Sequence, residues 1–146
     1  MLILDNKVAN VTYHENGNYV AIEYKKFAKS TAFREVWEKA GEVVIEKQIN
    51  KYLSDSRTMS VVSVEDQKWL ADDWAMRIRV AVPKDSFTAI VLDKNAFAEI
   101  SAKSIASSLT ENKSHDVSAT FEFFKDINAA KDWLKNVEHQ LKPLAR

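Results

Sequence analysis

Cysteine is absent from the 146 residues of the sequence. Its absence excludes disulfide scaffolds, zinc ribbons, thiol redox chemistry and cysteine nucleophiles. Small secreted domains often depend on disulfides, so their absence favours a reducing compartment and predicts a cytoplasmic protein. The segment 1–5 has no basic region and no long apolar stretch, so we expect no signal peptide.

Glycine and proline are scarce, at two residues each. So few of either argue against collagen-like, linker-like and low-complexity chains. The two glycines, Gly17 and Gly41, stand far apart, whereas phosphate-binding loops need several glycines close together. The sequence therefore has neither the dinucleotide fingerprint nor the Walker loop, and we predict no cofactor.

Charge of either sign is not in excess, because 21 basic residues balance 21 acidic ones. A net charge of zero argues against a nucleic-acid partner. No window contains the roughly 20 apolar residues of a membrane helix, so no stable membrane insertion is expected. The three histidines have no i, i+4 pair, and no metal site is predicted.

What the sequence does contain is 46% hydrophobic residues in periodic patterns, enough for the core of one domain over residues 1–146. Alternation predicts strands over 8–14 and 19–24, joined by a turn at 15–18 that contains Asn-Gly, with a short edge strand at 2–4.

The rest of the chain alternates helices and strands. The predicted helices cover 30–48, 63–81 with Ser63 as its N-cap, a segment beginning at Asp93 or Asn95 and reaching 109, and a last helix capped by Asp126. The predicted strands cover 49–55, 87–92 and 117–124. This order predicts an α/β fold: a mixed sheet of about five strands, with an N-terminal antiparallel hairpin, a parallel βαβ second half and about four helices.

Two segments carry a family resemblance. Residues 51–70, KYLSDSRTMSVVSVEDQKWL, hold a strand ending in Tyr-Leu-x-Asp-x-Arg, a short loop with a methionine, and a helix start of the form Ser-x-Glu-Asp-x-x-Trp. Residues 124–134, FKDINAAKDWL, form a closing helix. Both resemble the small bacterial STAS-like (SpoIIAA-like) proteins, and the order of elements agrees over nearly the whole chain.

The resemblance implies the fold of sulfate-transporter and anti-sigma-antagonist domains. Some relatives of that fold are regulators that bind a protein partner and carry a phosphorylatable Asp-Ser-Ser-Gly segment at a helix start. The comparable residues here are Val62, Ser63, Val64 and Glu65, with neither the aspartate nor the glycine. A similar topology occurs in lipid-transfer domains of the CRAL-TRIO type.

Polar residues follow the predicted strand 49–55. Ligand crevices of open α/β sheets form at the carboxyl ends of strands, so Asp55, Ser56, Arg57 and Ser63 are candidates for a small polar binding site. The alternative is an Asp–Arg ion pair and a capping serine that hold a loop in place.

Four tryptophans lie on predicted helices and are expected in the core, where helices pack on the sheet. The alternative is a wall for an apolar ligand or a partner surface, and Trp74, which stands beside two acids near a loop, is the candidate for it. The acids Asp72 and Asp73 are adjacent on a helix and do not converge on one site.

Three consecutive apolar residues, Val43, Val44 and Ile45, exceed what one buried helical stripe needs. They are candidates for self-association, and scattered exposed apolar residues are the ordinary alternative.

We predict no catalytic residue, since no Gly-x-Ser-x-Gly elbow accompanies the serines at 101–108. The first hypothesis is a non-enzymatic, cytoplasmic, STAS-like binding or regulatory domain with a protein partner or self-association. The alternative is a carrier of a small apolar ligand or lipid. A third hypothesis is an enzyme that uses Asp55 and Arg57 with His14 or His115.

Overall fold

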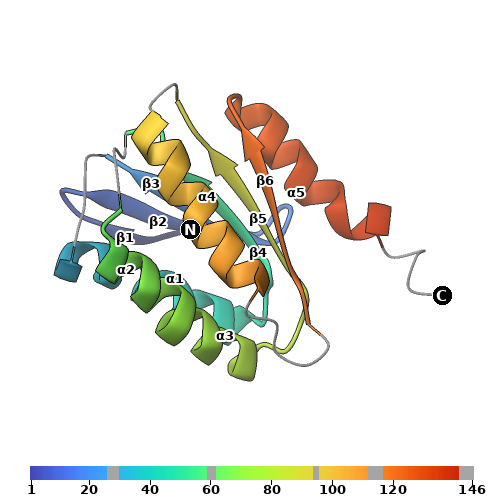
Figure 1. Ribbon diagram of the computed structural model, residues 1–146. Helices are drawn as coiled ribbons and strands as arrows, with labels where there is room; N and C mark the ends of the chain where they lie inside the picture. The colour runs from blue at the N-terminus through green and yellow to red at the C-terminus, as the bar shows by residue number, and fades with distance from the viewer. Residues whose placement is uncertain (26–29, 59–61, 94–95, 112–116, 142–146) are drawn as a thin grey trace.

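The structure, a computed structural model, describes residues 1–25, 30–58, 62–93, 96–111 and 117–141. Six strands of these residues form one sheet in the order β1-β2-β3-β4-β5-β6 (Figure 1). They are β1 (Leu2–Asp5), β2 (Ala9–His14), β3 (Tyr19–Tyr24), β4 (Lys51–Asp55), β5 (Ser86–Val91) and β6 (Ala119–Phe124). The first three strands pair antiparallel and the last four pair parallel, which confirms the predicted mixed sheet.

Helical crossovers connect the parallel strands, as predicted. The helical segments are α1 (Ser30–Lys47), α2 (Val64–Lys68), η1 (Trp69–Trp74), α3 (Ala75–Ala81), α4 (Ala96–Glu111) and α5 (Ile127–Leu141). α2, η1 and α3 follow one another without a break and form one continuous helical segment, called the arm below. With the arm counted as one helix, the described residues contain four helices. The expected cap at Asn95 lies outside the described residues. No helix in the described ranges is both long and apolar enough to cross a bilayer.

The two faces of the sheet have separate cores. On β3, Val20, Ile22 and Tyr24 belong to the core beneath α1 and the η1–α3 arm. Tyr19, from the same strand, belongs to the core beneath α5 together with Leu53 of β4. Side chains of a strand point alternately to opposite faces, so α5 covers one face alone, and the crossovers cover the other (Figure 1). The alternation predicted for 19–24 is confirmed.

Two turns use left-handed backbone. In the hairpin between β2 and β3, Gly17 has φ 96° and Asn18 has φ 56°, and the amide of Asn18 donates to the carbonyl of Glu15 at 3.1 Å. At the end of α1, Gln48 has φ 53°, and the amide of Ile49 donates to the carbonyl of Val44 at 3.2 Å. This second bond spans five residues, as in a Schellman motif, and it stops α1 just before β4.

The arm predicted over 63–81 differs from one regular α-helix. Its start is confirmed, since the amide of Asp66 donates to the Ser63 hydroxyl at 3.1 Å. Further along, η1 is π-helical, and the amide of Ala75 donates to the carbonyl of Leu70, five residues back. Apolar periodicity did not reveal this wider turn, because one extra residue per turn moves the buried stripe without interrupting it. Such π-helical turns are frequent at functional sites.

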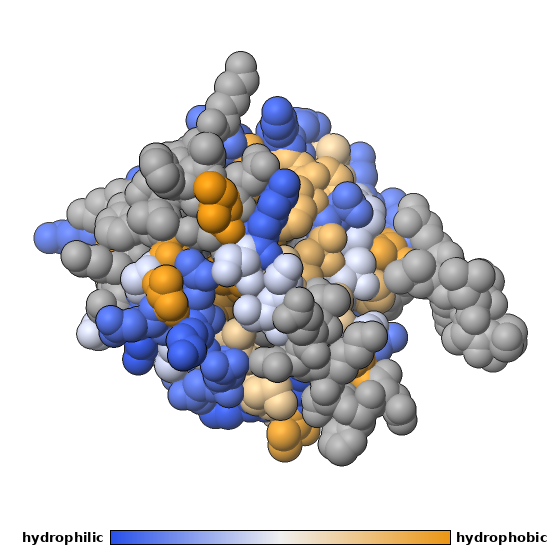
Figure 2. All heavy atoms as spheres, viewed as in Figure 1, coloured by the Kyte–Doolittle hydropathy of each residue, from blue (hydrophilic) through white to orange (hydrophobic). Residues whose placement is uncertain are grey.

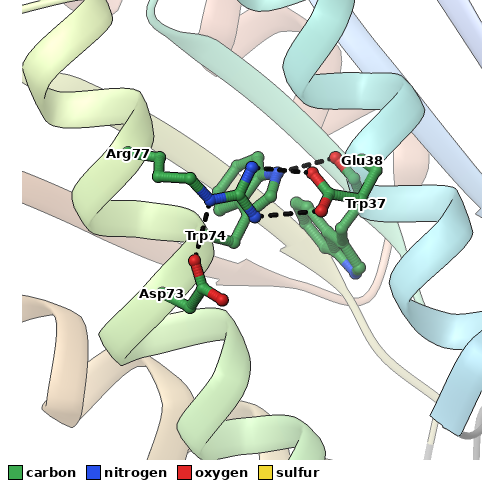
Figure 3. A network of polar contacts seen from close by, with 5 residues as sticks. All are labelled: Trp37, Glu38, Asp73, Trp74 and Arg77. Atoms are coloured by element: carbon green, nitrogen blue, oxygen red, sulfur yellow. Dashed lines mark hydrogen bonds and ion pairs between the residues drawn. The ribbon is translucent and has the colours of Figure 1, made fainter.

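Trp74 and Gly41 set how closely the arm packs on α1. The Trp74 indole donates from Nε1 to the backbone carbonyl of Trp37 at 2.7 Å (Figure 3). A Cβ at Gly41 would lie 2.9 Å from that nitrogen and 3.2 Å from Cδ1 of Ile78. A glycine inside α1 therefore makes room for the indole to reach the helix backbone.

Replacing Gly41 with alanine should destabilise the protein. Alanine favours the helix over glycine by about 1 kcal/mol, but displacing a buried indole costs about 1–3 kcal/mol. We expect a net loss of about 1 kcal/mol in the free energy of unfolding, measured by urea denaturation.

If contact with the indole causes this loss, the effects of substitutions at Gly41 and Trp74 on stability must be coupled. In a Trp74→Phe background, which has no Nε1, Gly41→Ala should cost less than in the wild type. Glu46→Ala, at an exposed position of α1, is the control and should be close to neutral. An equal cost of Gly41→Ala in both backgrounds would contradict the proposed packing.

Candidate functional site

The carboxyl edge of the sheet contains the predicted pair Asp55 and Arg57. Arg57 binds the Asp55 carboxylate with two donors, Nε to Oδ1 at 2.8 Å and Nη2 to Oδ2 at 2.7 Å. Asp55 is 5% exposed, whereas the side chain of Arg57 is 43% exposed. Asp55, with smaller contributions from Glu23 and Asp93, raises the pKa of Arg57 above its usual value. The pair therefore holds the loop after β4 in place.

The two candidate serines engage other groups. Ser56 shares a hydrogen bond with Ser54, with 2.9 Å between the hydroxyl oxygens. Ser63 caps α2. Among the described residues, no hydrogen bond or ion pair joins either serine to Asp55 or Arg57. The polar residues predicted to form one site therefore make three separate local contacts: Asp55 with Arg57, Ser56 with Ser54, and Ser63 with the start of α2.

A cavity of about 110 Å³ lies between the sheet and the helices α1, η1, α3 and α4. Its lining is mostly apolar and comes from segments far apart in the sequence. The aromatic and aliphatic lining residues are Tyr24, Phe33, Trp37, Ile49, Tyr52, Val62, Leu70, Trp74, Ala75, Ile78, Val82, Ile90, Ala102, Ile105, Ala119 and Phe121. A pocket of this composition is typical of a small-molecule site.

Trp74 belongs to this cavity. The sequence named Trp74 as the tryptophan to form a wall for an apolar ligand or a partner surface. In the structure its side chain is 5% exposed and is part of the cavity wall. Its ring lies edge-on to Trp37, with centroids 5.1 Å apart, and to Tyr52, with centroids 5.9 Å apart. These aromatic contacts, with the bond to the Trp37 carbonyl, hold the wall rigidly.

Polar side chains interrupt the apolar lining in two places. Tyr52, Ser54 and Thr88 project from neighbouring strands, and Tyr52 stands opposite Thr88 in the register. Arg79 and Lys84 line the cavity farther along, and Lys84 donates to the carbonyl of Gln48 at 2.8 Å. Burial raises the pKa of Tyr52 above its usual value, so its hydroxyl keeps its proton.

An ion network outside the cavity ties the arm to α1. The Arg77 guanidinium binds both carboxylate oxygens of Glu38 at 3.0 Å, and its Nε binds Asp73 at 2.7 Å (Figure 3). All three side chains are about half exposed. Asp73 therefore serves an ion pair at the surface, and Asp72 does not join it in that contact.

The apolar run in α1 lies mostly in the core. Val43 is 4% exposed and Val44 is fully buried, whereas Ile45 is 42% exposed. Of the three residues predicted for self-association, only Ile45 is available at the surface of the chain. Figure 2 shows the strongly hydrophobic residues of the viewed face in separate spots among hydrophilic ones.

The residues of the enzyme hypothesis do not converge where the structure describes them. His14 stacks on Tyr19 at the start of β3, with ring centroids 4.8 Å apart. Asp55 pairs in register with Glu23, near the other end of the same strand. His115 lies outside the described residues. Within the described ranges, no three His, Asp or Glu side chains are grouped to hold a metal ion.

Sequence reasoning missed the cavity, because its lining comes from four strands and four helical segments. One signal was present: Tyr52, Ser54 and Thr88 are polar residues on a buried face of predicted strands. Their positions in the strands place them on one face of the sheet. Only the packing of the crossover helices shows that a cavity lies between this face and the helices.

Comparison with known proteins supports the fold. No family model matches the sequence, and no curated protein matches it. A matching solved structure is an uncharacterized protein of the DUF3478 family from Shewanella loihica PV-4, described as having a SpoIIAA-like fold. The two are 13% identical with a TM-score of 0.54, and the match covers 90% of this chain and 98% of that chain.

The architecture is therefore that of a mixed α/β domain whose crossovers pack on one face of the sheet. More particularly, the chain has a SpoIIAA-like fold, which confirms the fold implied by the sequence resemblance.

Arg57→Gln should destabilise the protein more than Arg77→Gln. Loss of Arg57 leaves the buried Asp55 carboxylate without its two charged donors, and we expect a cost of about 1–3 kcal/mol. Loss of Arg77 leaves Glu38 and Asp73 without this partner, but water already reaches both carboxylates. We therefore expect a loss of at most about 1 kcal/mol in the free energy of unfolding. Urea denaturation of the two matched variants measures both, and an equal or larger loss at Arg77 would refute the structural role given to Arg57.

Proposed function

We propose that the protein is a non-enzymatic, cytoplasmic binding domain of STAS type that holds a small, mostly apolar ligand in the cavity beneath its crossover helices. The observation that carries the proposal is the cavity itself, with its volume of about 110 Å³ and its aromatic and aliphatic lining. An engineered apolar cavity of about 150 Å³ in another protein binds benzene. A ligand of this cavity should therefore be about as large as benzene.

The surroundings of the cavity support binding rather than chemistry. Its charged lining residues have partners in the protein: Lys84 binds the Gln48 carbonyl, and Arg79 contacts the Met76 sulfur. The buried Asp55 carboxylate is occupied by Arg57. A catalytic site needs titratable groups within reach of a common reacting atom, and the described groups pair locally instead.

A second candidate function is binding of a protein partner through residues 54–63. It is favoured by the exposure of Arg57 and Ser63 within that segment and of Val64 directly after it, which is 69% exposed. Val64→Glu, at an exposed position outside the cavity lining, should weaken such binding without changing ligand binding in the cavity, so one variant separates the two functions.

Benzene should bind the wild-type protein saturably, because it matches the cavity in size and chemistry. In a titration followed by ¹H–¹⁵N correlation spectra, we expect shifts centred on residues around the lining. Ala75→Leu, which puts a larger aliphatic side chain into the cavity, should abolish the shifts. Absence of saturable shifts in the wild type would refute the proposal.

The control for the filling variant is Ala129→Leu, the same change at an exposed position of α5 outside the cavity. It should bind benzene like the wild type. Thermal unfolding must show that Ala75→Leu remains folded, and equal benzene binding by the folded variant would also refute the cavity as the site. A native mass spectrum of freshly purified protein gives the mass of any ligand that copurifies.

A further inference from the structure

The hydroxyls that line the cavity differ in whether another described residue binds them. Tyr24 also lines the cavity, and its hydroxyl accepts a hydrogen bond from Nε1 of Trp37 at 2.7 Å. The Ser54 hydroxyl is paired with that of Ser56. The hydroxyls of Tyr52 and of its register neighbour Thr88, in contrast, have no hydrogen bond to any of the described residues, although these side chains are only 5% and 8% exposed. Of the two, the longer Tyr52 side chain reaches farther from the sheet.

The Tyr52 oxygen opens into the cavity, because among the described residues the one sealed side-chain polar atom without a partner is Asn10 Oδ1. Nearly all buried polar groups in native structures have a hydrogen-bond partner. Leaving one unsatisfied forfeits the bond it made with water in the unfolded chain. Tyr52 cannot recover that bond from its ring neighbour Trp74, because the Trp74 indole already donates to the Trp37 carbonyl. A cavity occupant with an acceptor atom would supply the missing partner.

Burial raises the pKa of Tyr52, so the hydroxyl keeps its proton and can donate as well as accept. A ligand carbonyl needs only this donor. A ligand hydroxyl or amine would bring a donor of its own into a mostly apolar lining. A carboxylate ligand would lose its hydration among mostly apolar walls. The two cations of the lining already have contacts in the protein, Lys84 with the Gln48 carbonyl and Arg79 with the Met76 sulfur. A neutral oxygen loses far less hydration than an anion.

We infer that the cavity selects small apolar molecules that carry one neutral acceptor oxygen, such as a cyclic ketone or a short aliphatic carbonyl compound, and that the Tyr52 hydroxyl donates to this oxygen. This inference rests on the proposed function, since it names the class of ligand for the same cavity. The aromatic wall formed by Trp37 and Trp74 contacts the hydrocarbon body of the ligand, and Tyr52 orients its oxygen.

The test uses two probes of nearly equal shape, cyclohexanone and methylenecyclohexane, which differ by an oxygen in place of a methylene group. Their dissociation constants are measured by NMR titration with the wild type, Tyr52→Phe and Tyr24→Phe. We expect Tyr52→Phe to weaken the binding of cyclohexanone about 3- to 10-fold, as for loss of one neutral hydrogen bond. Binding of methylenecyclohexane should stay unchanged or become tighter.

Tyr24→Phe is the matched control, because it removes a hydroxyl from the same lining that already has a partner. It should leave the ratio of the two dissociation constants unchanged. The variants also differ in stability without ligand: Tyr24→Phe should lower the melting temperature because Trp37 loses its acceptor, whereas Tyr52→Phe should not.

Each outcome decides one of the two proposals. If both probes bind and Tyr52→Phe leaves their ratio unchanged, the inferred ligand class is wrong and the cavity remains the binding site. If cyclohexanecarboxylate binds more tightly than cyclohexanone, the preference for a neutral ligand is overturned. If neither neutral probe binds the folded wild type, the proposed function fails together with the inference.

Discussion

The hydrogen bond from the Trp74 indole to the Trp37 carbonyl is the contact on which the crossover face of the sheet depends. It brings the arm against the backbone of α1, and Gly41 provides the space for this approach. The same indole forms a wall of the cavity and packs against Tyr52. Because one side chain fixes both the helix packing and the cavity wall, the shape of the cavity is tied to the stability of the fold.

The sheet separates two tasks. Its α5 face is a compact core in which Leu53, Ala89 and Leu134 are almost fully buried. Its other face carries the crossovers, and there the packing leaves a space of about 110 Å³. An arm with a π-helical turn, bulky indoles and small residues such as Ala75 does not fill the area above Tyr52 and Thr88. A well-packed core on one face supports an incompletely filled one on the other, which is a physical basis for binding a ligand without a large rearrangement.

Sequence reasoning located the strands and most helix starts, because those depend on neighbours. Alternation over 19–24 and the cap at Ser63 are read from a few adjacent residues, and both are confirmed. The site was harder to predict. Asp55 and Arg57 pair with each other, as the simpler of the two readings expected, whereas the cavity depends on residues up to about a hundred positions apart along the chain. No local pattern shows that such residues meet.

The sequence by itself determined the class of the fold, the alternation over 19–24, the turn at Gly17 and the cap at Ser63, since these follow from backbone sterics and periodicity within short segments. Only the tertiary structure decided that Trp74 turns inward, that Val43 and Val44 belong to the core while Ile45 does not, and that Tyr52 lines the cavity. These outcomes depend on how closely helices from distant segments approach one another. That distance is set by shape complementarity across the layers, which a one-dimensional pattern does not contain.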